Sequence, residues 1–378
     1  MYDRIACCFK CCLLKWIEEL GLDANEAHWR QRGVNFFIHQ GSGGKLRSLE
    51  ATSAPIMARD FVLHPRFAVA RFAHFQAIES RDLALLNDST PRAVLRSGLL
   101  RVPHAWRANG TLVALNGWGH GPPLLRRISE SLPAGPTALL YGDDETWEAS
   151  ELQAIRDAFS RPLVRHFAMN IDEKSSALPW VQQVPIGLNS ASASLASLLA
   201  APSWARTVVQ MASADARSPE LVCCCQRPWP HRARAFEALR AAGHTHCNLS
   251  ERIHYEDLFT RYTRHRFVVS VWGHGHSDFR EWEILLAGAV PVVQRFAEHG
   301  GLLEGLPVVR VDDWSTVTPA FLEREWARLQ REAAEGKLSW TKVFFPYWLD
   351  QFTAHMGRPH RASRALPNRV LHKHQRQF

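Results

Sequence analysis

The sequence predicts an α/β protein of two successive lobes, each a parallel sheet covered by helices, followed by a C-terminal helix. A chain of 378 residues, 46% hydrophobic and 22% charged, is long enough to bury two cores. Apolar runs of strand length alternate with amphipathic stretches over residues 56–200, and the alternation resumes over 217–335. The Ala- and Ser-rich segment 190–216 lies between them. We therefore expect an interdomain connection there, although its composition also permits a helix.

In the first lobe, short apolar runs predict strands and amphipathic stretches predict helices. The expected strands are TLVALN at 111–116, TALLYG at 137–142, LVRHFAMN at 163–170 and VQQVPIGLN at 181–189, with helices at 122–131 and 148–159. Residues 1–55 precede this lobe as a helical or irregular lead-in, with a glycine-rich loop at Gly41–Gly44.

The second lobe shows the same alternation. Its expected strands are ELVCCCQ at 220–226, RFVVSV at 266–271, VPVVQ at 290–294 and LPVVRVDD at 306–313, with helices at 231–242, 279–287 and 319–335. The last helix is rich in strong helix formers and in pairs of opposite charge. A helical segment at 336–356 and a basic tail at 357–378, which we expect to be disordered, complete the chain.

The net charge of +8 does not predict a nucleic-acid partner, because six of the eight excess charges lie in the tail. Those six are Arg358, Arg361, Arg364, Arg369, Lys373 and Arg376. The remaining chain is nearly balanced and has no basic stripe interleaved with aromatic residues. No membrane-spanning helix is expected, since the apolar stretch Ile5–Ile17 is interrupted by two lysines and falls short of the roughly 20 residues required.

The eight cysteines do not resemble a disulfide framework or a zinc site. They comprise Cys7, Cys8, Cys11 and Cys12, the triplet Cys223, Cys224 and Cys225, and Cys247 on its own. On a helix the first group would share one face, which suits burial or, as an alternative, acylation beside a membrane. The triplet falls in a run of strand length, where we expect cysteine to act as a small buried hydrophobic residue.

The segment SVWGHGHSDFREWEILLAGAVPVV at 270–293 is the most informative stretch. It reads as a strand, a loop with Gly273 and Gly275, a helix capped by Asp278, and a second strand. Main-chain amides at such a helix start, with the helix dipole, favour a diphosphate. The predicted donor-binding residues here are Gly273, His274, Gly275, Asp278, Arg280 and Glu283.

Arg280 offers a fork of donors for phosphate oxygens, and Glu283 offers acceptors for ribose or sugar hydroxyls. We expect both side chains on an exposed turn of the helix. The alternative is a purely structural unit, because any strand–loop–helix unit carries a glycine turn and a cap. A dinucleotide site is disfavoured, because the third glycine of its fingerprint is absent and Gln294 stands where an acid would bind ribose.

With these motifs, residues 111–329 resemble the exostosin-like glycosyltransferases. The resemblance depends on an ordered set of motifs. These are Asp278, Arg280, Trp282, Glu283, Gly288 and Pro291, then Asp313–Trp314 downstream, and YGDDE, HFAMNID and VPIGLN upstream.

The resemblance implies two facing Rossmann-like domains of the GT-B type. It implies a nucleotide-sugar donor (a UDP- or GDP-sugar) bound by the second domain, a carbohydrate acceptor, and transfer with inversion at the anomeric carbon. It implies no tightly bound cofactor and no metal. Members are commonly anchored in the Golgi by an N-terminal membrane helix, which this sequence does not show, so the compartment stays open.

Such a transfer needs a base for the acceptor hydroxyl and positive groups for the departing diphosphate. Arg227 and Arg232 follow the cysteine strand and are predicted to join Arg280, whereas Arg234 has a solvated helix face as its equal alternative. The predicted catalytic residues are Asp143, Asp144 and His120, with Asp172 as a further candidate base. Two rival functions stay open.

The first rival is a non-catalytic glycan- or nucleotide-binding homologue. The second is a metal-dependent hydrolase that uses Asp143 and Asp144 with nearby histidines. For His274 and His276 we expect hydrogen bonding or solvent exposure rather than metal ligation.

Overall fold

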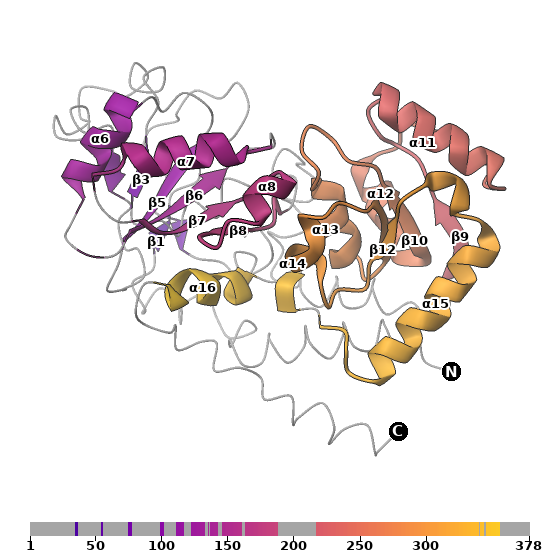
Figure 1. The fold of residues 1–378 in the computed structure, drawn as a ribbon. Coiled ribbons are helices and arrows are strands. Elements are labelled where there is room, and N and C mark those ends of the chain that lie inside the picture. The colour runs from indigo at the N-terminus through magenta and orange to yellow at the C-terminus, as the bar shows by residue number, and fades with distance from the viewer. Residues whose placement is uncertain are drawn as a thin grey trace.

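The computed structural model contains two parallel α/β sheets, one in each half of the chain (Figure 1). The structure describes residues 35–36, 54–55, 75–77, 99–101, 111–116, 122–132, 135, 137–142, 146–160, 163–187, 217–339, 341–343 and 345–355. The predicted fold class, α/β with two Rossmann-like units and a C-terminal helix, is confirmed.

The N-terminal sheet has the strand order β4-β3-β5-β6-β7-β8. Its pairs are parallel except β3 with β4. The strands are β3 (Phe75–Ala77), β4 (Leu99–Arg101), β5 (Thr111–Asn116), β6 (Thr137–Gly142), β7 (Leu163–Ala168) and β8 (Val181–Gln183). The helices of this lobe are α6 (Pro122–Ser131), α7 (Ala149–Ala158) and α8 (Glu173–Ser176).

The C-terminal sheet is parallel throughout, with the order β12-β11-β10-β9. Its strands are β9 (Ser218–Val222), β10 (His265–Ser270), β11 (Val290–Gln294) and β12 (Val309–Val311). The helices are α11 (Pro230–Ala241), α12 (Tyr255–Arg264), α13 (Phe279–Leu286), α14 (His299–Leu303) and α15 (Pro319–Ala334), with a short 3-10 turn η4 (Trp314–Thr316).

Residues of both lobes share one hydrophobic core. Phe167 and Met169 at the end of β7 belong to the same buried cluster as Trp282 of α13. The last helix, α16 (Phe345–Ala354), follows the 3-10 turn η5 (Thr341–Val343) and returns to the N-terminal lobe (Figure 1). There the ring of Phe352 packs edge-on against Phe167 at 4.7 Å between centroids. Helix α16 therefore packs against the first sheet.

Several sequence-based boundaries need correction. The predicted strand 220–226 ends at Val222, before the cysteine triplet, and the predicted strand 306–313 is limited to Val309–Val311. The predicted elements do not include α12, although its sequence forms a helix in the structure. They also do not include an antiparallel pair, β1 (Asn35–Phe36) with β2 (Ala54–Pro55), inside the lead-in that was expected to be helical or irregular.

The absence of disulfides was a wrong expectation. Cys223 and Cys247 are joined by a disulfide, with their Cα atoms 4.9 Å apart. The chain after α11 returns alongside the end of β9, where the amide of Asn248 donates to the carbonyl of Cys223, and this return brings the two cysteines together. Sequence spacing alone could not reveal this return, because the two cysteines are 24 residues apart.

Other expectations lie outside the described residues. They concern the glycine loop 41–44, the N-terminal cysteines 7–12, the connection 190–216, the tail 357–378, and the candidate bases His120, Asp143 and Asp144. Among the helices that the structure does describe, none has the length and apolar character needed to span a membrane.

We predict that Phe352→Ala lowers the free energy of unfolding by about 3–5 kcal/mol, because it empties a fully buried ring site between α16 and β7. Urea denaturation followed by tryptophan fluorescence measures the change. Gln351→Ala is the matched control on the same helix, and we expect it to cost below about 1 kcal/mol. Equal effects of the two substitutions would show that the helix does not depend on this ring contact.

Candidate functional site

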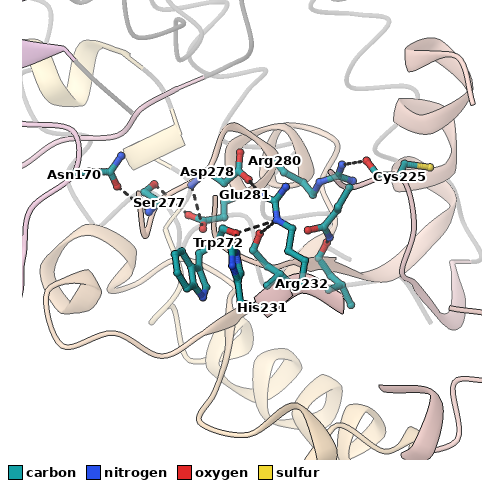
Figure 2. A network of polar contacts seen from close by, with 12 residues as sticks. Asn170, Cys225, His231, Arg232, Trp272, Ser277, Asp278, Arg280 and Glu281 are labelled. Carbon is teal, nitrogen blue, oxygen red and sulfur yellow. Dashed lines mark hydrogen bonds and ion pairs between the residues drawn. The ribbon is translucent and has the colours of Figure 1, made fainter. Parts of the chain in front are cut away.

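The candidate site lies where the carboxyl ends of two sheets meet. Asn170 follows β7 of the N-terminal lobe, and Ser277 lies in the loop between β10 and α13 of the C-terminal lobe. The amide of Ser277 donates to Oδ1 of Asn170 at 2.8 Å (Figure 2). Ligands of open α/β sheets bind outside the carboxyl ends of the strands. This hydrogen bond therefore places the loop 271–278 at the edge where a ligand is expected.

Arg232 of α11 holds the loop in place. Its Nε donates to the carbonyls of Val271 and Trp272, at 3.1 and 3.0 Å. Its Nη2 pairs with Oδ2 of Asp278 at 2.6 Å, and the arginine is only 6% exposed. A helix, the end of a strand and the cap of the next helix are thus joined by one guanidinium (Figure 2).

The same ion pair explains why residue 273 is glycine. A Cβ at Gly273 would lie 3.3 Å from Nη2 of Arg232 and 3.4 Å from Oδ2 of Asp278. The first of these contacts is tighter than most Cβ contacts in proteins. Glycine at this position therefore leaves room for the loop's own ion pair, and its predicted close approach to a ligand stays a prediction.

The start of α13 is capped by the protein's own side chains. Asp278 and Glu281 form a reciprocal capping box, and the hydroxyl of Ser277 also donates to Glu281. Glu281 is 1% exposed, and its burial together with the charge of Asp278 raises the pKa of this carboxyl well above its usual value. The amides of Ser277, Asp278 and Glu281 therefore already have protein acceptors. This corrects the expectation that the turn offers these amides to a diphosphate.

Arg280 is also held by protein groups rather than on an exposed turn, which is a second correction. Its Nη1 donates to the Tyr262 hydroxyl at 2.6 Å and to the Cys224 carbonyl at 3.4 Å. Its Nη2 donates to the Cys225 carbonyl at 2.5 Å (Figure 2). The physical reason is that the segment directly after β9 presents the carbonyls of Cys224 and Cys225 toward the first turn of α13.

Glu283 is likewise buried, at 5% exposure, so its predicted exposed position was wrong. It lies near two tyrosines of α12, the partly buried Tyr255 and the buried Tyr262. Burial raises the pKa of Tyr255, and the neighbouring Glu283 carboxylate raises it further. Burial raises the pKa of Tyr262 too, with the Glu283 charge again contributing. Glu283 therefore belongs to an internal polar cluster beneath the loop.

Two of the three predicted arginines, Arg227 and Arg232, lie over the same Trp229 ring, with 5.5 and 4.8 Å from guanidinium to ring centroid, and Arg280 lies in the helix that Asp278 caps. Burial lowers the pKa of Arg232, the charges of Arg280 and Arg227 lower it further, and Asp278 opposes them. Arg227 is exposed, and its guanidinium lies 5.5 Å from the centroid of the Trp229 ring. Arg234 is exposed on α11, which agrees with the alternative that it lies on a solvated helix face.

The histidines of the loop hydrogen-bond or face solvent, as expected. His274 is exposed and lies edge-on to Trp229 at 4.6 Å. His276 stacks on Phe296 at 3.8 Å, and its Nδ1 is hydrogen-bonded to Oε1 of Glu298. Burial raises the pKa of Glu298, but the bond to His276 outweighs it and the pKa is lowered. This histidine–carboxylate pair was not predicted, because Glu298 lies 22 residues away in sequence.

Asp172, a further candidate base, is committed to a structural role. Its Oδ1 accepts a hydrogen bond from the amide of Ser175 at 2.7 Å and caps α8. The principal candidates, Asp143, Asp144 and His120, lie outside the described residues and stay predictions.

No model of a known protein family and no curated protein matches this sequence. Among solved structures, the chain is similar to an OtsA apo structure, with 12% identity, a TM-score of 0.41, and coverage of 74% of this chain and 81% of that chain. It is similar to the UDP complex of HepE from Anabaena, with 11% identity, a TM-score of 0.36, and coverage of 64% and 78%.

It is also similar to an α,α-trehalose 6-phosphate synthase from Burkholderia multivorans, with 13% identity, a TM-score of 0.39, and coverage of 85% and 88%.

We predict that acid weakens the fold partly through His299. Burial lowers its pKa from 6.5 to about 4, so the imidazole stays neutral in the folded state while the unfolded state takes up a proton. Its contribution is complete above about pH 6.5 and is lost as the pH falls toward 4. The shift corresponds to about 3 kcal/mol.

His299→Gln should therefore lose less stability than the wild type between pH 7 and pH 4, as measured by urea denaturation at each pH. His274→Gln, at an exposed position, is the matched control. If both variants follow the wild-type pH dependence, His299 does not titrate as its burial requires.

Proposed function

We propose that this protein is a glycosyltransferase that binds a nucleoside diphosphate sugar at the C-terminal lobe and transfers the sugar to a glycan or glycoconjugate acceptor, with inversion. The observation that carries the proposal is the cluster of Arg227, Arg232 and Arg280 at the carboxyl end of the C-terminal sheet, beside the contact with the N-terminal lobe. The donor class is a UDP- or GDP-sugar.

The charge of this cluster supports an anionic ligand. Arg227 and Arg232 lie over the same Trp229 ring, the charges of Arg280 and Arg227 lower the pKa of Arg232, and Asp278 pairs with Arg232. A diphosphate beside Arg227 would relieve the repulsion between like charges. Arg232 and Arg280 are fixed by internal hydrogen bonds, so they would stabilise the leaving diphosphate through preorganised charge.

Arg227 is exposed, whereas Arg232 and Arg280 are hydrogen-bonded to protein groups. Its guanidinium is exposed beside Trp229, at the start of the segment that leads into α11. It is therefore the residue of the cluster best suited to direct, two-pronged contact with phosphate oxygens. The ordered motifs that resemble exostosin-like glycosyltransferases also support a nucleotide-sugar donor. The base for the acceptor hydroxyl is proposed among Asp143, Asp144 and His120.

Arg227→Ala should weaken binding of UDP or GDP by about tenfold or more, corresponding to about 1.4 kcal/mol or more, because it removes a charge-assisted contact. Isothermal titration calorimetry with each nucleotide measures the affinity. Arg234→Ala removes the same charge from an exposed position on α11 and should leave the affinity within about twofold. Equal losses in the two variants would mean that only net charge matters and would contradict the assigned site.

The double substitution Asp143→Asn and Asp144→Asn tests catalysis separately from binding. If one of these carboxylates is the base, release of UDP or GDP from the donor sugar should fall by about 100-fold or more while nucleotide affinity is kept. A coupled assay for free nucleoside diphosphate measures the rate. Wild-type protein that binds nucleotide without turnover across donor and acceptor panels would favour the non-catalytic homologue. Turnover abolished by chelation would favour the metal-dependent hydrolase.

A further inference from the structure

The cysteine triplet after β9 contains two different kinds of cysteine. Cys223 is joined to Cys247, whereas Cys224 and Cys225 are free thiols. The Sγ atoms of Cys224 and Cys225 lie 2.8 Å apart. The triplet therefore supplies a vicinal dithiol beside a disulfide.

The backbone at Cys225 explains why the two sulfurs meet. Successive side chains in an extended strand point to opposite faces, which would keep neighbouring thiols apart. Cys225 has φ of +63°, the only positive value among the described residues other than glycine. A left-handed conformation is unfavourable for a residue with a Cβ and persists only where its surroundings impose it. Here it breaks the alternation and turns both thiols to the same side.

The surroundings of the pair favour a thiolate at Cys225. The contact with the Cys224 sulfur lowers the pKa of Cys225, and the guanidinium groups of Arg280 and Arg261 lower it further, against burial and the Glu251 carboxylate, which raise it. The same contact and burial raise the pKa of Cys224, which keeps its proton. A thiolate next to a resolving thiol is the arrangement that reacts with oxidants.

A bound cation fits this place less well. The Glu251 carboxylate lies within 4.8 Å of both sulfurs, but its two oxygens already accept hydrogen bonds from Arg261, at 3.2 and 3.0 Å. Nη1 of Arg261 is also 3.6 Å from Sγ of Cys224. Because the guanidinium of Arg261 contacts both the carboxylate and the Cys224 sulfur, the cluster favours an anionic sulfur over a metal ion.

We propose that Cys224 and Cys225 form a redox modification site that hydroperoxides oxidise to a vicinal disulfide, and that this oxidation disturbs the anchoring of Arg280. The Cys225 thiol first releases its proton to solvent; the thiolate attacks the terminal oxygen of the hydroperoxide, the O–O bond breaks, and a sulfenic acid and an alkoxide (or hydroxide) result, which takes a proton from solvent and leaves as an alcohol (or water). The Cys224 sulfur then attacks the sulfenic sulfur, the S–O bond breaks, and the hydroxyl leaves with the thiol proton as water. Two thiols are oxidised and one hydroperoxide is reduced.

The link to Arg280 follows from the backbone. A disulfide between adjacent cysteines closes a small ring that includes the peptide unit between them. The carbonyl of that unit, on Cys224, accepts a hydrogen bond from Nη1 of Arg280, and the next carbonyl, on Cys225, accepts from Nη2. Closing the ring reorients its own peptide unit, and with it the Cys224 carbonyl, relative to α13; the Cys225 carbonyl adjoins the ring. Oxidation at the sulfurs would thereby weaken the contacts that fix one arginine of the cluster.

Peptide mass spectrometry on the full-length protein tests the chemistry. After treatment with hydrogen peroxide and alkylation of remaining thiols, the peptide that carries Cys224 and Cys225 should lose two hydrogens and escape alkylation at both residues. In Cys224→Ser the reaction should stop at a sulfenic acid on Cys225, which dimedone traps. In Cys225→Ser peroxide should produce no dimedone adduct at Cys224. Alkylation of both thiols after peroxide treatment of the wild type would overturn the proposal.

Thermal denaturation tests the consequence without assuming any enzymatic function. Peroxide should lower the melting temperature of the wild type by a few degrees, because the hydrogen bonds of Arg280 are strained, and should leave that of Cys225→Ser unchanged. Cys225→Ser keeps both backbone carbonyls and therefore serves as the matched control. A wild-type disulfide that forms with no change in melting temperature would overturn the coupling to Arg280. Because neither readout uses a nucleotide, failure here is distinct from failure of the glycosyltransferase proposal.

Discussion

The ion pair between Arg232 and Asp278 is the interaction on which the candidate site depends. Arg232 is 6% exposed and joins α11 to the end of β10 and to the cap of α13. Removal of one partner of a buried pair costs about 3–5 kcal/mol, because the other charge is left without compensation. Glycine at position 273 leaves room for the two paired side chains. The loop at the interlobe contact is thus a fixed structure, and any ligand there would meet charges already in position.

This rigidity changes the role expected of each arginine in the cluster. Arg232 and Arg280 donate to protein carbonyls, a tyrosine hydroxyl and a carboxylate, so under the proposed function they would act on a bound anion through their charge. Arg227 is exposed, so it is the arginine that a ligand would contact directly. A site built from two fixed positive groups and one exposed group would suit a reaction in which negative charge develops on a leaving diphosphate, because fixed charges need no reorganisation during the reaction.

The sequence predicted the alternation of strands and helices well, because hydrophobic period and capping residues are local signals. TLVALN, TALLYG and VPVVQ are strands with the predicted bounds, and the box of Asp278 with Glu281 does cap α13. The predictions that failed concern contacts between residues far apart in the sequence. Glu283 and Arg280 were expected on an exposed turn, but their environment is set by α12 and by the end of β9, which sequence spacing does not place beside them. The Cys223–Cys247 disulfide and the His276–Glu298 pair failed to be predicted for the same reason.

The central claim is that a nucleoside diphosphate binds at the carboxyl end of the C-terminal sheet. A crystal structure of the full chain grown with UDP or GDP tests it most directly. The account predicts that the phosphates lie beside the guanidinium of Arg227, within a few ångströms of Arg232 and Arg280, and on the side of the loop that faces Asn170. Nucleotide density at the opposite ends of the strands, or bound to the N-terminal lobe alone, would contradict it.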